Sequence, residues 1–157
     1  MTCIDCSGVR AWTELDERAR EGVRGAAALR LSLEREPRAA SLARAAVREF
    51  GDVCAIAPAD CATLTLLVSE LVSNAVRHSD APSASAITVH ARELDCGGVR
   101  VEVIDRGSGF TVRLREPGGI SGGYGLCLLD EQATRWGVDR EDGTRVWFEL
   151  EVPASAG

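Results

Sequence analysis

The sequence predicts an α+β fold in which helices cover one face of a mostly antiparallel sheet. Three observations support this prediction: strands come in pairs joined by short turns, helices come in separate blocks, and the strict strand–helix alternation of a parallel sheet is missing. The pattern G-x-G-x-x-G between a first strand and a helix, which marks dinucleotide-binding folds, is missing as well.

The first half of the chain supplies one strand and two helices. Residues 1–27 have little periodicity and read as a tail or a loosely docked helix. A short strand is expected at 29–33, and Pro37, which suits the first turn of a helix, introduces a helix over about 38–50. A second helix is expected over 58–78, with an apolar stripe at helical spacing formed by Leu64, Leu67 or Val68, Leu71 and Ala75.

Two strands and a glycine-rich stretch follow. Apolar residues alternate with polar ones over 87–92 and again over 99–104, and a Cys-Gly-Gly turn separates the two segments. His90 falls on the polar side of its strand and is expected at the surface. Residues 106–123 have no regular pattern.

The chain ends with a helix and a hairpin. The spacing of apolar residues predicts a third helix, stopped by Gly137 as its C-cap, along Leu126, Leu129, Ala133 and Trp136. The hairpin is expected to join 137–140 to 145–152 through a turn at Asp142-Gly143.

Composition limits the classes of function. The 157 residues, 45% of them hydrophobic, make one domain with a core of its own. The net charge of −6 argues against direct binding to nucleic acid through phosphate contacts, and all 18 basic residues are arginine, which excludes a mechanism that needs lysine. No run approaches the ~20 apolar residues of a membrane span, and the N-terminus lacks a signal-peptide core. A cytoplasmic protein without a membrane partner is therefore expected.

The cysteines are expected to be free thiols, as is usual in a reducing compartment: Cys3, Cys6, Cys54, Cys61, Cys96 and Cys127. Cys3 and Cys6 form a lone C-x-x-C without the further ligands that a four-coordinate zinc site needs, so a metal or redox role is the less favoured alternative.

Glu70 and Asn74 are four residues apart in the second predicted helix, so both project from one face, with Arg77 and His78 one turn further on. Carboxylate and amide oxygens suit Mg²⁺, which usually keeps several waters and needs only one or two protein ligands. Taken alone, such a pair is more often a solvated polar face, and an imidazolium at His78 also suits the end of a helix.

Asp105 falls on the apolar side of its strand, together with Val101 and Val103. A carboxylate there is costly unless it is hydrogen-bonded or paired with a charge. Gly107 and Gly109 follow at once and permit a ligand to approach the backbone closely. The arrangement suits an acceptor for an exocyclic amine such as that of adenine, and the alternative is an aspartate that caps its own turn.

A second glycine segment, at 121–125, opens the third predicted helix. Free N–H groups at a helix start, without side-chain bulk around them, favour an anion, and the alternative is a flexible loop that enters a helix. The segment between the two glycine motifs, with Arg113 and Arg115, is either a lid over a phosphate or a loop without a role.

Read in order, these motifs resemble the N, G1 and G2 boxes of the gyrase/Hsp90/histidine-kinase/MutL (GHKL) ATPase superfamily: SELVSNAVRH at 69–78, DRGSG at 105–109 and GYGL at 123–126. The resemblance covers 29–152, and the short length and the form of the N box are similar to the anti-sigma-factor serine kinases of bacteria. It implies a two-layer α/β sandwich of the Bergerat type. The expected organisation is an N-terminal extension (1–28), an ATP-binding kinase domain (29–153) and a tail (154–157).

The resemblance also implies a role for each matching residue. Asn74 would coordinate Mg²⁺, and Glu70 would be the general base. Asp105 would bond the adenine amino group, with Thr144 close to adenine. The phosphates and the pocket with its lid would be contacted by Arg77, His78, Gly107, Gly109, Gly123, Gly125 and Leu126.

The function implied by the resemblance is an ATP- and Mg²⁺-dependent protein-serine/threonine kinase that acts as an anti-sigma factor. Its expected partners are a sigma factor, an anti-anti-sigma protein of the STAS type and a second copy of the chain in a homodimer. Two alternatives stay open: an ATP-gated binding module without turnover, and a detached histidine-kinase catalytic domain. The latter needs a phospho-acceptor histidine on a dimerisation helix, and neither His78 nor His90 lies in such a segment.

Overall fold

The structure, a computed structural model, describes residues 2–6, 9–15, 27–82, 84–95, 97–107 and 124–152, with 2–6, 9–15 and 124–126 described by their backbone. Within these residues one seven-stranded sheet has the order β1-β2-β3-β4-β5-β7-β6, and all its neighbouring strands are antiparallel. The elements along the chain are β1 (Thr2–Cys6), β2 (Val9–Leu15), β3 (Ala27–Leu33), α1 (Ala39–Val53), α2 (Pro58–His78), β4 (Ile87–Glu93), β5 (Val99–Asp105), α3 (Tyr124–Gln132), β6 (Arg135–Asp139) and β7 (Thr144–Leu150).

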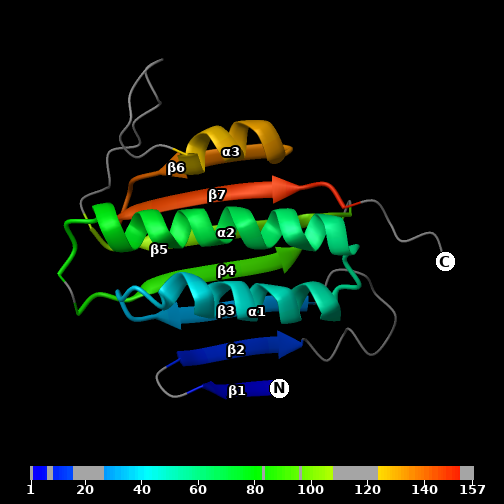
Figure 1. Ribbon diagram of the computed structural model, residues 1–157, viewed down its shortest axis with the longest axis horizontal. Helices are drawn as coiled ribbons and strands as arrows, with labels where there is room; N and C mark the ends of the chain where they lie inside the picture. The colour runs from blue at the N-terminus through cyan, green and yellow to red at the C-terminus, as the bar shows by residue number, and fades with distance from the viewer. Residues whose placement is uncertain are drawn as a thin grey trace.

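The helices form a second layer on one face of the sheet. Figure 1 shows α1 and α2 side by side in front of the strands, with α3 beside α2 at the β6–β7 edge. Helix α1 packs over β3, and α2 packs over β5. The predicted fold class, a two-layer α/β sandwich with a mostly antiparallel sheet, is confirmed.

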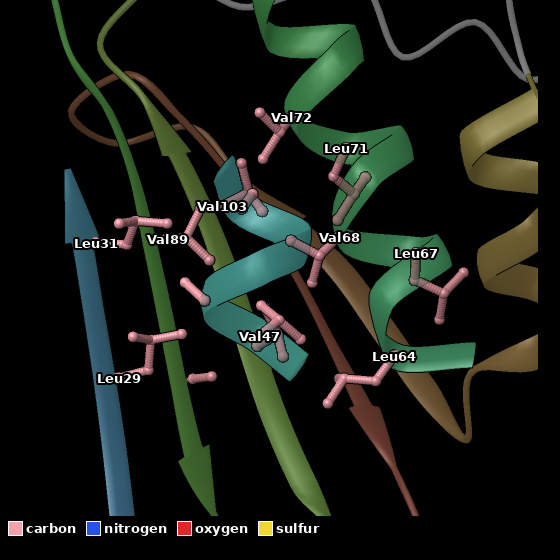
Figure 2. Close-up of a cluster of buried hydrophobic side chains, with 14 of the residues drawn as sticks. Leu29, Leu31, Val47, Leu64, Leu67, Val68, Leu71, Val72, Val89 and Val103 are labelled. Carbon is pink, nitrogen blue, oxygen red and sulfur yellow. The ribbon is translucent and has the colours of Figure 1, made fainter. Parts of the chain in front are cut away.

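The core lies between the two layers, where every second strand residue meets the helices. In β5 buried and partly buried residues alternate along the whole strand, as the two-residue period of a strand requires. Figure 2 shows Val89 and Val103 of the sheet facing Val68 and Val72 of α2. The predicted stripe of α2 is confirmed, because all of its residues are buried: Leu64, Leu67, Val68, Leu71 and Ala75.

Among the helices that the structure describes, α2 is long and apolar enough to cross a membrane on length and composition alone. Eight of its residues are buried within the protein. Packing of these residues in the core accounts for much of its apolar composition.

The N-terminal region differs from its prediction. Residues 2–6 and 9–15, expected within a tail or a loosely docked helix, are the strands β1 and β2. Strand β2 pairs with the edge of β3, from Leu15 opposite Ala27 to Arg10 opposite Ser32. Backbone pairing of this kind does not require a periodic apolar pattern, so the local sequence carried no sign of it. The division at residue 28 stays a prediction.

The third helix is shorter than predicted. It ends at Gln132, and Trp136 and Gly137 lie in strand β6 instead. Gly137 is therefore not a C-cap. A Cβ atom there would lie 2.7 Å from the Trp147 ring, so the glycine makes room for that ring on the neighbouring strand. The first helix, predicted over about 38–50 and introduced by Pro37, runs from Ala39 to Val53.

Candidate functional site

Asp105 is the last residue of β5, and its side chain is only 1% exposed. The inward orientation predicted from strand alternation is confirmed. Its Oδ1 atom accepts a hydrogen bond from the Gly107 N–H at 3.3 Å and another from the Arg35 guanidinium. Its Oδ2 atom is buried and has no hydrogen-bond partner among the described residues. One oxygen of the carboxylate is thus hydrogen-bonded, and the other is buried without a partner among the described residues.

Thr144 lies directly opposite Asp105, as the first residue of β7 in the β5–β7 register. It is fully buried, and its Oγ1 atom also has no hydrogen-bond partner among the described residues. A buried polar atom without a partner costs about 1–3 kcal/mol. Two such oxygens on paired residues therefore mark a place where a ligand with a polar edge would be stabilised, and adenine, with an amino group beside a ring nitrogen, has such an edge.

Arg35 connects this carboxylate to helix α2. It follows β3, its side chain is 7% exposed, and its Nη1 donates to the Ala75 carbonyl at 2.6 Å while Nη2 donates to Asp105. Sequence reasoning missed Arg35 altogether. Its two partners are 40 and 70 positions away along the chain, so no local pattern marks it.

Two glycines let the backbone close around Asp105. A Cβ atom on Gly107 would collide with Ser79 Oγ and lie 2.7 Å from Asp80 Oδ1, in the segment that leaves α2. Gly143 has a φ of 110°, and a Cβ atom there would collide with the Asp105 carbonyl oxygen and lie 2.9 Å from the Arg106 Cα. The end of β5 is thereby held between the end of α2 and the β6–β7 turn.

The other predicted polar residues lie on α2. Glu70 and Asn74 are both partly buried, and Asn74 directly precedes the Ala75 whose carbonyl Arg35 binds. Arg77 and His78 are exposed in the last turn, where Arg77 Nε donates to the Ser73 carbonyl at 3.3 Å. No group of three or more His, Cys, Asp or Glu side chains converges among the described residues. The oxygens of Glu70 and Asn74 nevertheless fit Mg²⁺, which keeps most of its ligands as water and phosphate.

The glycine residues of the predicted lid are covered only in part. Gly109 and Gly123 lie outside the described residues, as do Arg113 and Arg115. Gly125 and Leu126 are placed by their backbone in the first turn of α3. The predicted roles of these glycines in the pocket stay predictions.

The remaining titratable residues singled out by sequence lie away from Asp105. His90 was expected at the surface but is partly buried, and burial, followed by the charge of Arg30, lowers the pKa of its imidazole. Burial also raises the pKa of the Cys54 thiol to about 12. Among the described side chains, Cys54, Cys61 and Cys127 are free thiols, as predicted.

A two-layer sandwich in which an inner strand ends in a buried aspartate, beside a long helix with Glu and Asn one turn apart, is the architecture of a nucleotide-binding ATPase domain. The chain belongs to the family of histidine kinase-, DNA gyrase B- and HSP90-like ATPases, which matches residues 59–154. Glu70, Asn74, Asp105 and Thr144 all lie within the matched range, and Arg35 lies outside it.

Among solved structures, the chain is similar to the crystal structure of the RsbU and RsbW domains of Rv1364c from Mycobacterium tuberculosis. The sequence identity is 27% and the TM-score 0.65 over 80% of this chain. The chain spans about a third of that protein's length, since the match covers 32% of it. No curated protein matches the chain.

Proposed function

We propose that this protein is an ATP-dependent protein-serine/threonine kinase that acts as a cytoplasmic anti-sigma factor and phosphorylates an anti-anti-sigma protein of the STAS type. The observation that carries the proposal is the pair of buried oxygens without partners, Asp105 Oδ2 and Thr144 Oγ1. Family membership and the similarity to a structure with an RsbW domain support the finer assignment.

In this mechanism Asp105 and Thr144 bind the adenine ring of ATP. Oδ2 accepts a hydrogen bond from the adenine amino group, and the Thr144 hydroxyl bonds the adjoining ring nitrogen. Both contacts form in a water-excluded place, so they orient the nucleotide at little cost in competing hydration.

Helix α2 carries the residues that we assign to the phosphates and to phosphoryl transfer. Asn74 would hold Mg²⁺ through its amide oxygen, and the ion would supply positive charge against that of the phosphates. The oxygen of the substrate serine forms a bond to the γ-phosphorus, and the bond from that phosphorus to ADP breaks. Glu70 accepts the proton that the serine hydroxyl loses. Arg77 and His78, exposed at the end of the same helix, are available to the phosphates. Phosphoryl transfer depends mainly on positioning and charge stabilisation, so these groups suffice.

The experiment uses Mg-ATP labelled at the γ-phosphate, the full chain and a panel of purified STAS-type proteins. We expect transfer to a serine or threonine of one panel member. Glu70→Gln should lower the transfer rate about 10²–10⁴-fold, because it removes the general base, while the affinity for ATP changes less than about twofold. Glu131→Gln, an exposed glutamate on α3, is the matched control and should transfer at the native rate.

Two outcomes would change the proposal. Transfer at the native rate by the Glu70→Gln protein would remove Glu70 as the base. Tight ATP binding and ATP-dependent capture of a partner, without transfer to any panel member, would favour the alternative of a non-catalytic ATP-gated binding module.

A further inference from the structure

We infer that Arg35 determines which nucleobase the site accepts, because it fixes Asp105 as a hydrogen-bond acceptor. The inference rests on the proposed function and extends it to a residue outside the range that the family matches. It concerns a positioning residue, because Arg35 acts through Asp105.

The carboxylate of Asp105 is paired with a buried cation. Arg35 and Asp105 form an ion pair with side-chain exposures of 7% and 1%, so water does little to screen it. A guanidinium is always charged and only donates hydrogen bonds, so the Asp105 oxygen that it contacts acts as the acceptor.

The two oxygens of this carboxylate differ in their contacts. Oδ1 already accepts from Arg35 Nη2 and the Gly107 N–H, so Oδ2 is the oxygen left without a partner among the described residues and the one we assign to the ligand. A carboxylate oxygen that acts as an acceptor binds an amino group and repels a carbonyl oxygen. Adenine carries an amino group at the ring position where guanine carries a carbonyl oxygen. The ion pair therefore selects ATP over GTP.

Arg35 also contacts the end of helix α2, and the experiment must separate the effect of this contact from the effect on Asp105. Ala75 is among the last four residues of α2, whose carbonyls have no partner within the helix, and Arg35 Nη1 bonds one of them. If this helix contact were the whole role of Arg35, its removal would lower stability and leave the choice of base unchanged.

The experiment measures the dissociation constants of Mg-ATP and Mg-GTP for the full chain and two variants. Arg35→Gln keeps an amide donor but loses the charge, and we expect its preference for ATP over GTP to fall at least about tenfold. Arg35→Lys keeps the charge and should retain the preference within about threefold. Arg38→Met is the matched control, because Arg38 is exposed and pairs only with Glu36 among the contacts described, and its preference should equal the native one.

The outcomes distinguish the inference from the proposed function. If the native protein binds ATP and the Arg35→Gln variant keeps the native preference for ATP over GTP, the inference is overturned and the proposed function stands. A folded Arg35→Lys variant that loses the preference overturns it as well, and this arm decides the matter if Arg35→Gln does not fold. Native protein that binds neither nucleotide overturns the proposed function and the inference with it.

Discussion

Replacing Thr144 with valine should change stability and ligand binding in opposite directions. Thr144 is fully buried, and its hydroxyl has no partner among the described residues. Valine has nearly the same shape, and β7 is a strand in which a β-branched residue is favoured. The substitution therefore removes an unsatisfied polar atom from the core without opening a cavity.

The magnitude follows from the cost of such an atom. A buried hydroxyl without a hydrogen bond costs about 1–3 kcal/mol, so we expect Thr144→Val to stabilise the ligand-free protein by about 1 kcal/mol. For a domain of this size that is a rise in Tm of about 2–4 °C. With ATP bound, the variant lacks one hydrogen bond of about 0.5–1.5 kcal/mol, and its affinity should fall about two- to tenfold.

Thermal unfolding with and without Mg-ATP measures both effects, because a ligand that binds only the folded state raises Tm. Thr65→Val is the matched control. Thr65 is also buried, but its Oγ1 bonds the Cys61 carbonyl at 2.6 Å, so its loss should leave Tm unchanged or lower and leave the ATP-induced shift intact. A ligand-free Thr144→Val protein that melts below the native one would refute the reasoning, because that result would mean that the Thr144 hydroxyl has a hydrogen-bond partner in the native protein.

Three further predictions concern packing and protonation. Gly107→Ala should cost about 1–3 kcal/mol, seen as a fall in Tm of about 2–12 °C, because the new methyl group collides with Ser79 and Asp80. Cys54, whose pKa burial raises to about 12, should react with iodoacetamide near pH 8 on the order of 10³-fold more slowly than after unfolding in urea, and equal rates would contradict this. The pKa of His90 is lowered by burial and by Arg30, so the unfolded chain takes up a proton first and stability is lost as pH falls through about 6.5. Urea titrations from about pH 7 to pH 5 should then show a smaller loss for His90→Gln than for the native protein, and parallel losses would contradict the prediction.

Local periodicity was sufficient where an element buries a regular stripe. The helix at 58–78 and the burial of Asp105 both follow from the spacing of apolar residues, because burial in α2 and β5 is periodic. The same reasoning extended the third helix to Trp136, where the periodicity continues by coincidence. Trp136 instead pairs with Phe148 of β7, and this contact between distant segments outweighs the local helical pattern.

The candidate site could be predicted only in its parts. Asp105 was predicted from its motif and Thr144 from the family resemblance, but their pairing across β5 and β7 is a matter of register between strands. Arg35 is the clearest case, since its charge has meaning only once the fold places it beside Asp105.

The two ends of the proposed nucleotide site are mechanically connected. The Arg35 guanidinium donates to the carboxylate of Asp105, which we assign to adenine, and to the carbonyl of Ala75. Ala75 directly follows Asn74, the proposed magnesium ligand. Gly107 packs against the segment that leaves the same helix. A shift of Asp105 would therefore pull on the part of α2 that carries Asn74, because close-packed contacts transmit displacement rather than absorb it. Recognition of the base and placement of the phosphates should consequently be coupled, and substitutions at Arg35 should affect transfer as well as binding.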